Sequence, residues 1–132
     1  MSGLMQFDLV SPEAALVSME IISVEIPGAE GDFTAMLQHA PLITSLRPGF
    51  LKVNSNDGTK EYLVTGGFVE INTTSTSVLA EQAFDRENIT KDIVDELVND
   101  AEKALANCGE DSRDALEKRL HDTKLLKDFL DF

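Results

Sequence analysis

Short stretches of alternating apolar and polar residues recur along the first 84 residues of the chain. Residues 5–9 (MQFDL) and 22–26 (ISVEI) each show the period of two that is typical of half-buried strands. The alternation slips phase at Ile21-Ile22, and because neighbouring strand residues face opposite sides, the slip predicts a bulge or a turn from one sheet to another. The N-terminal part is therefore predicted to consist of strands that change sheet at this point.

Two further pairs of strands are predicted to form hairpins. Residues 50–53 and 61–64 flank the segment NSNDGT (54–59), in which Asn, Asp and Gly adopt left-handed backbone conformations at low cost. Residues 68–71 and 77–80 form the second pair. Short strands separated by turn residues predict an antiparallel β-sandwich over residues 1–84, since two packed sheets hide strand edges better than one flat sheet.

The spacing of apolar residues changes after Phe84. Asn88 is the predicted N-cap of a first helix and Gly109 its C-terminal stop. A second helix is predicted to start at Asp111 or Ser112 and to bury its leucines. The apolar positions of the first helix recur three and four residues apart, on one helical face: Ile89, Ile93, Leu97, Ala101, Ala104 and Leu105.

The predicted fold class is α+β, with an N-terminal antiparallel β-sandwich at 1–84 followed by a C-terminal antiparallel two-helix hairpin at 85–132. An apolar fraction of 42% is enough for a packed core. An isolated pair of short helices buries its apolar stripes poorly, so the hairpin is predicted to pack on the sandwich or on a partner.

The net charge of the chain limits the classes of partner that it is expected to bind. A formal net charge of −13 argues against nucleic acid and anionic lipid, because both are bound by summing many Lys and Arg contacts. No apolar run approaches the roughly 20 residues of a membrane-spanning helix, so any membrane contact is expected to go through protein partners. With Cys108 as its single cysteine and no recognisable signal segment, the chain is expected in a reducing, cytosol-facing compartment.

The sequence offers little for catalysis. Its two histidines, His39 and His121, lie in different predicted parts, which argues against a histidine metal site or a Ser-His-Asp relay. The pair Gly66-Gly67 is not followed by the Lys-Ser/Thr or helix start of a phosphate-binding loop. We therefore predict no catalytic residue, no metal site and no cofactor.

Two motifs resemble those of one protein family. The segments PGAEGDF (27–33) and HAPLITSLRPG (39–49) resemble the signature of the bacterial F-type ATP synthase epsilon subunit, whose second half is retained closely. The segments VTGGFVEI (64–71) and SVLAEQA (77–83) resemble two later strands of the same family, in the same order and spacing. The resemblance covers nearly all of the predicted sandwich, and the hairpin only in length and position.

The resemblance implies a rotor component without catalytic activity. The sandwich would pack on the gamma subunit and on polar loops of the c-ring, and would help to transmit proton-driven ring rotation to the catalytic alpha-beta hexamer. The expected location is the cytoplasmic face of the bacterial plasma membrane, reached indirectly through the complex.

The resemblance also implies roles for individual residues. Asp32 and His39 match residues that approach the c-ring. A purely structural role, as an acidic residue in a turn and as a structural histidine, is an equally open interpretation. The loop departs from the family at Thr34 and at Leu37-Gln38, where Gly and Pro-Gly are usual, which predicts a different backbone path. The loop otherwise retains Gly31, Ala40, Pro41, Leu42, Pro48 and Gly49. The strand motif expected to face gamma contains Gly66, Gly67, Phe68 and Glu70.

For the hairpin, the resemblance implies possible inhibition of ATP hydrolysis through contacts with the alpha and beta subunits. Basic residues that could make these contacts cluster on the second helix: Arg113, Lys118, Arg119, Lys124 and Lys127. Some relatives bind ATP between these helices, but the corresponding segment VDELVN (94–99) lacks the required arginine, so ATP binding is not expected. Two readings from other classes stay open: a free-standing β-sandwich binding module, and a small hydrolase built on clustered acids.

Overall fold

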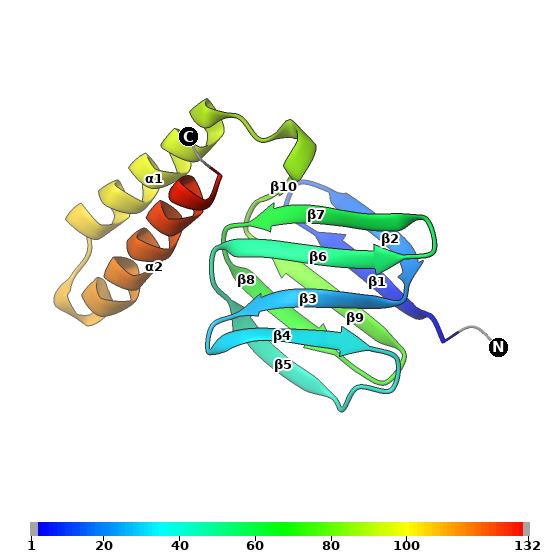
Figure 1. Cartoon of the computed structure of the whole chain (residues 1–132). Helices are drawn as coiled ribbons and strands as arrows, with labels where there is room; N and C mark the ends of the chain where they lie inside the picture. The colour runs from blue at the N-terminus through cyan, green and yellow to red at the C-terminus, as the bar shows by residue number, and fades with distance from the viewer. Residues whose placement is uncertain (1–2, 131–132) are drawn as a thin grey trace. The chain divides into compact units, whose positions relative to one another are not determined.

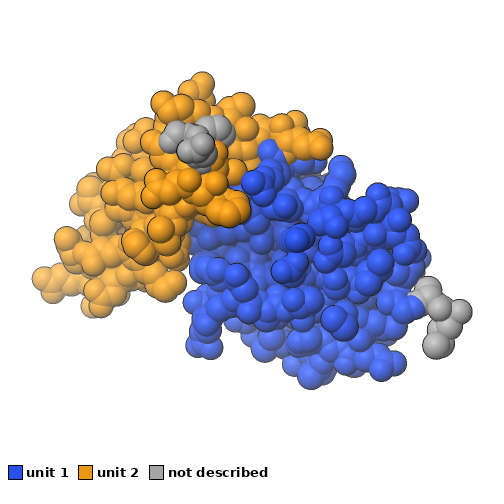
Figure 2. Space-filling model, in the orientation of Figure 1, with its two compact units in different colours: residues 1–86 blue, residues 87–132 orange. Residues whose placement is uncertain are grey.

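The computed structural model of the chain describes residues 3–130. The chain divides into two compact units, Met1–Arg86 and Glu87–Phe132 (Figure 2). The boundary predicted between residues 84 and 85 falls inside strand β10 (Ala83–Asp85), which is too short to show an alternation that could be recognised in the sequence.

Unit 1 is one curled sheet whose two halves face each other as a β-sandwich (Figure 1). One half has the order β10-β7-β6-β3, with β4 added to β3, and the other has the order β5-β8-β9-β1-β2. The halves are joined where Gly28 of β3 pairs with Leu46 of β5. Besides β10, the strands are β1 (Met5–Val10), β2 (Ala15–Ile21), β3 (Ser23–Gly28), β4 (Gly31–Met36), β5 (Leu42–Leu46), β6 (Gly49–Ser55), β7 (Gly58–Val64), β8 (Gly67–Ile71) and β9 (Ser75–Ala80), and a 3-10 turn η1 (Arg86–Asn88) follows.

The core of unit 1 lies between the two halves of the sheet. Residues of β1 alternate between buried and half-buried positions, as the period of two predicts. The phase slip at Ile21-Ile22 marks the passage from β2 to β3, which belong to opposite halves, so the predicted change of sheet is confirmed. The largest fully buried side chains of the unit are Phe7, Met5, Leu9, Ile21, Ile26, Leu51, Leu63 and Ile71.

Both predicted hairpins are confirmed. Strands β6 and β7 pair as far as Ser55 and Gly58, so the turn between them is only two residues long. Gly58 has a φ of 123°, a backbone conformation that favours glycine in this turn. Strands β8 and β9 form the second hairpin. The sheet departs from a wholly antiparallel arrangement in one place, because β1 pairs with β9 in parallel.

Unit 2 is the predicted helical hairpin, built from α1 (Lys91–Ala106) and α2 (Glu110–Phe129). An ion pair joins Asp95 near the start of α1 to Lys127 near the end of α2, so the helices run antiparallel (Figure 1). Within residues 3–130, neither helix is long and apolar enough to cross a membrane.

The predicted ends of the helices are wrong in detail. The N-cap of α1 is Thr90, whose side chain accepts a hydrogen bond from the Ile93 amide at 3.3 Å, because the predicted cap Asn88 is taken up by η1. Asn107 caps the C-terminus of α1, and Gly109 is the N-cap of α2 instead of a stop. The second helix therefore starts at Glu110, one residue before the predicted start.

The apolar face of α1 is partly confirmed. Leu97 and Ala101 are buried as predicted, and Val94 is buried beside them. Ile93 and Leu105 are half-buried on the same face, and Ala104 is the predicted member that is exposed. A small alanine carries too little apolar surface to be informative about burial.

Thr65, between β7 and β8, carries the one buried side-chain oxygen that lacks a hydrogen-bond partner among the described residues. Since an unsatisfied buried hydroxyl costs about 1–3 kcal/mol of desolvation, we expect Thr65→Val to stabilise unit 1 by up to roughly 1 kcal/mol. Thr65→Ser keeps the hydroxyl and loses the methyl group, so it is the matched control and should destabilise by about 1 kcal/mol. Urea denaturation measures both, and a destabilised valine variant would show that the hydroxyl is satisfied in solution.

Candidate functional site

An exposed apolar row crosses the outer face of the half β5-β8-β9-β1. Phe68 of β8 and Leu79 of β9 lie directly opposite each other, and their side chains are 59% and 54% exposed. Ile43 of β5, 69% exposed, is diagonal to Phe68 on the same face. On the other side, Val10 of β1 pairs with Leu79. These four residues, of which Val10 is half-buried and the other three are exposed, are called the outer row below. Contiguous apolar side chains that are exposed in this way mark a contact surface.

Only part of the predicted gamma-facing motif points outward. Phe68 and Glu70 are exposed, whereas the two glycines serve the backbone. Gly66 and Gly67 have φ values of 151° and 130°, and a Cβ at Gly67 would lie 2.0 Å from the Leu79 carbonyl oxygen. Gly67 thus allows β8 to approach β9, and places Phe68 opposite Leu79. Ile43 and Leu79 occupy outward-facing positions in the alternating segments 42–46 and 77–80. This position is the sequence signal that would have identified them.

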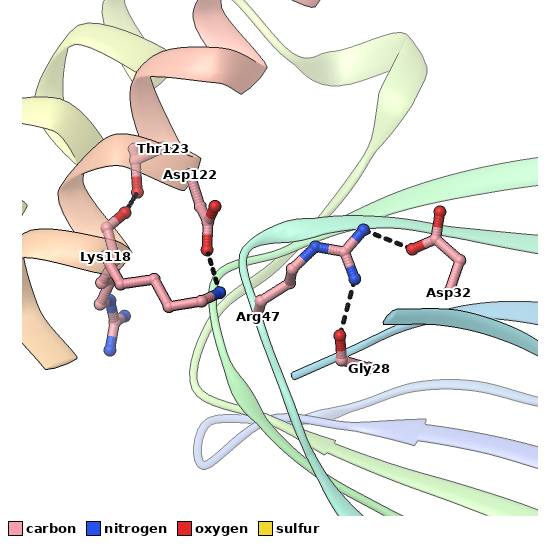
Figure 3. A network of polar contacts seen from close by, with 7 residues as sticks. Gly28, Asp32, Arg47, Lys118, Asp122 and Thr123 are labelled. Carbon is pink, nitrogen blue, oxygen red and sulfur yellow. Dashed lines mark hydrogen bonds and ion pairs between the residues drawn. The ribbon is translucent and has the colours of Figure 1, made fainter. Parts of the chain in front are cut away.

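Asp32 lies in a second candidate region, at the start of β4 next to the turn from β3 (Figure 3). The guanidinium of Arg47, which directly follows β5, donates through Nη1 to the Gly28 carbonyl at 2.7 Å. Its Nη2 donates to Oδ1 of Asp32 in an ion pair. The carboxylate is 73% exposed and the guanidinium 28%. Gly28, Asp32 and Arg47 are called the corner below.

His39 does not join Asp32 in one site. Asp32 is the second residue of β4, whereas His39 lies in the loop that follows the strand's other end. The Nδ1 of His39 is 2.6 Å from the Ala40 carbonyl, and its ring centroid is 6.4 Å from that of Phe33. A partner that contacts both Asp32 and His39 must therefore extend along β4.

The remaining loop residues fall into exposed and buried groups. Gly31, Ala40, Pro41 and Leu42 are exposed, whereas Pro48 and Gly49 are buried at the start of β6. Gln38 has a φ of 69°, so it adopts the left-handed conformation that favours glycine. Its amide donates to the Thr73 carbonyl at 2.7 Å, which holds the loop against the turn between β8 and β9.

Most of the basic residues proposed for the hairpin are paired within the hairpin. Arg113 pairs with Glu117 at 3.0 Å and Lys118 with Asp122 at 3.2 Å, both across one turn of α2 (Figure 3 shows the second pair). Lys127 pairs with Asp95 across the two helices at 2.8 Å. Of the other two, Arg119 is half-buried and Lys124 is exposed. The five cations therefore do not form one unpaired basic surface.

The pair between Asp95 and Lys127 should make the hairpin pH-dependent. The hydrogen bond from Lys127 lowers the pKa of Asp95, and the charges of Lys127 and Lys91 act in the same direction. A lowered carboxyl pKa adds stability above its ordinary value of 3.8, and this stability is lost as the pH falls below that value. We expect Asp95→Asn to weaken the hairpin at neutral pH and to remove this part of its acid sensitivity.

Amide hydrogen exchange in the last turns of α2, measured against pH, tests this expectation. Glu117→Gln is the matched control, because it removes a pair within α2 and leaves the contact between helices. Equal effects of the two substitutions on the protection of α2 would mean that the interhelical pair has no special role.

The described residues contain no group of three or more His, Cys, Asp or Glu side chains placed to hold a metal ion. The outer row, the corner and the hairpin are three separate surface features of the chain. Each is suited to contact another macromolecule by apolar burial or by polar complementarity.

Comparison with known proteins supports this view of the chain. Residues 4–86 match the family described as ATP synthase, Delta/Epsilon chain, beta-sandwich domain. The ATP synthase epsilon chain of Jannaschia sp. is 51% identical over 114 residues, which cover 86% of each chain. The ATP synthase epsilon chain of Fuscovulum blasticum is 50% identical over 127 residues, which cover 96% of each chain.

Solved structures share the fold at low sequence identity. A chain of the Euglena gracilis mitochondrial ATP synthase, from a cryo-EM structure that includes its c-ring, superposes with a TM-score of 0.73 at 21% identity, over 98% of this chain and 83% of that one. A chain from the central stalk and c-ring of the Tetrahymena thermophila mitochondrial ATP synthase gives 0.58 at 19% identity, over 67% and 71%. The sandwich followed by helices is thus an established arrangement.

Proposed function

This chain belongs to the ATP synthase epsilon chain family, and from that premise we propose that it is a rotor component of a proton-translocating F-type ATP synthase. An epsilon chain is a subunit of the ATP synthase complex and not its catalytic subunit. In the proposed role the chain couples rotation of the c-ring to ATP synthesis through contacts with other subunits. It would lie at the cytoplasmic face of the bacterial plasma membrane and be held there by the complex.

The outer row is the observation that carries the proposal. Three large apolar side chains, Ile43, Phe68 and Leu79, are each more than half exposed on one face of the sandwich. Burying exposed apolar surface contributes about 25 cal/mol per Å², and aromatic residues are enriched among the anchors of protein interfaces. We assign this face to the gamma subunit. Glu70, on the same face, would contribute a polar contact beside Phe68.

Asp32 and His39, in β4 and in the loop after it, are assigned to polar loops of the c-ring. Asp32 offers an exposed carboxylate at one end of β4, and His39 offers an imidazole at the other. A strand at the margin of a sheet exposes backbone donors and acceptors between these two groups, which suits a partner with polar loops. Surface charge of one sign also speeds association with a surface of the other sign.

The hairpin is assigned a regulatory role, as a brake on ATP hydrolysis that acts through the alpha and beta subunits. The ion pairs of Arg113, Lys118 and Lys127 limit the positive charge available in the closed hairpin. On opening, Lys127 would lose its partner on α1, whereas the pairs of Arg113 and Lys118 within α2 would persist. This favours modest inhibition.

Affinity purification of a tagged chain from its native membrane tests the proposal. We expect the gamma, alpha, beta and c subunits to co-purify. Removal of residues 87–132 should leave this set intact and increase the rate of ATP hydrolysis if the hairpin acts as a brake. A chain that emerges alone and binds a small ligand would instead support a free-standing binding module.

A further inference from the structure

The corner occupies the seam of the sandwich. Gly28 ends β3 in one half of the sheet, and Arg47 follows β5 in the other, next to the single pair that joins the halves. The amide of Arg47 donates to the Pro27 carbonyl at 3.0 Å, which adds a backbone bond across the same seam. Both the main chain and the side chain of Arg47 therefore hold the turn between β3 and β4 in place.

The turn itself is closely folded. A Cβ at Gly28 would lie 2.7 Å from the Gly31 carbonyl oxygen and 2.9 Å from the Phe33 ring, so only glycine fits there without movement. The Ala29 amide also donates to the Ser45 carbonyl of β5 at 3.0 Å. Asp32 thus starts from a backbone that is fixed on both sides of the turn.

We propose that the corner is a preorganised docking point for a polar loop of the c-ring, in which Arg47 is the residue that positions the Asp32 carboxylate. The inference rests on the proposed function and adds to it a residue that has no place in the assigned ring contacts. The planar guanidinium satisfies the Gly28 carbonyl and the carboxylate at the same time, which a lysine ammonium does with less fixed geometry.

Exposure decides which group of the pair meets the partner. The carboxylate is 73% exposed, whereas the guanidinium is 28% exposed. The partner loop is therefore expected to supply N–H or hydroxyl donors to Asp32. Because Arg47 already holds Asp32 in one orientation, docking does not have to order that side chain, and this reduces the entropic cost of association.

Two assays with the complex of the source organism separate this positioning from the assembly of the rotor. The first measures the affinity of the chain for the gamma-containing soluble part without the ring. The second measures ATP-driven proton pumping by membranes depleted of the chain, against the concentration of chain added back. Wild type, Asp32→Asn, Arg47→Ala, Arg47→Lys and the double variant Asp32→Asn with Arg47→Ala are compared.

We expect Asp32→Asn and Arg47→Ala to change the first affinity by less than roughly twofold and to raise the half-saturating concentration in the second assay by about tenfold. The effect of Arg47→Lys should be intermediate, since lysine retains the positive charge but lacks the planar guanidinium with its two donor nitrogens. The double variant should be no worse than Arg47→Ala, because both changes disable the same contact.

An unchanged second assay for Arg47→Ala, or effects of Asp32→Asn and Arg47→Ala that simply add, would overturn the positioning role. Thermal melting of every variant identifies any that misfolds. If Arg47→Ala misfolds, the two single variants Arg47→Lys and Asp32→Asn are compared instead. Failure of the wild-type chain to bind in the first assay would count against the proposed function itself and is distinguishable from these outcomes.

Discussion

Phe68→Asp is expected to weaken binding of the chain to the gamma-containing assembly by about 100-fold or more, since aromatic anchors at interface centres dominate binding energy. Phe68 is the aromatic member of the outer row, with Leu79 directly opposite. The substitution removes apolar contact and forces a carboxylate into a surface that loses its water on binding. Because the side chain is already more than half exposed, the fold should be retained.

A titration of the gamma-containing assembly with labelled chain measures this effect. Ile22→Asp is the matched control: Ile22 is also an exposed apolar residue, but it lies between β2 and β3, outside the outer row. The control should bind within about threefold of wild type, as expected for a substitution far from the interface centre. Equal losses for both variants would show that the outer row is not the docking face.

Gly67→Ala is expected to destabilise unit 1 by about 3 kcal/mol or more, among the largest effects of any single substitution in the chain. The backbone at Gly67 has a φ of 130°, which residues with a side chain rarely adopt. The added Cβ would also lie 2.0 Å from the Leu79 carbonyl oxygen and 2.9 Å from the Cα of Ala80. Strands β8 and β9 would have to separate there, so the outer row would be lost as well.

Chemical denaturation followed by circular dichroism measures the loss. Gly58→Ala provides the control, because Gly58 also has a positive φ of 123° but has nothing within 4 Å of an added Cβ. Its cost should be about 1 kcal/mol, the conformational part alone. If Gly67→Ala costs no more than Gly58→Ala, then the close approach of β8 and β9 is not rigid in solution.

The sequence was sufficient for the features with a local signal. The alternation around residues 5–9 and the turn residues before Gly58 predicted strands and a hairpin that the structure contains. The change of period after Phe84 predicted the helices. Local patterns work here because strand and helix periodicity are fixed by backbone geometry.

Features that depend on distant residues could not be predicted in this way. Asp32 and Arg47 lie 15 residues apart, and nothing in either segment indicates that they pair. The cap of α1 could not be decided either, because Asn88 and Thr90 are both suitable N-caps and only the 3-10 turn selects Thr90. The outer row emerges only when the register of β5, β8, β9 and β1 places its members side by side.

The parallel pairing of β1 with β9 also sets the order in which unit 1 can be completed during synthesis. During synthesis β1 can pair with β2 soon after both have been made, but its other edge stays open until β9 has been made. A nascent chain that stops before β9 therefore exposes an unpaired strand edge together with the apolar side chains of Met5, Phe7 and Leu9. Long-range closure of this kind slows folding and leaves such intermediates prone to aggregation. A chain shortened to end before β9 is therefore expected to aggregate more readily than one that includes β9.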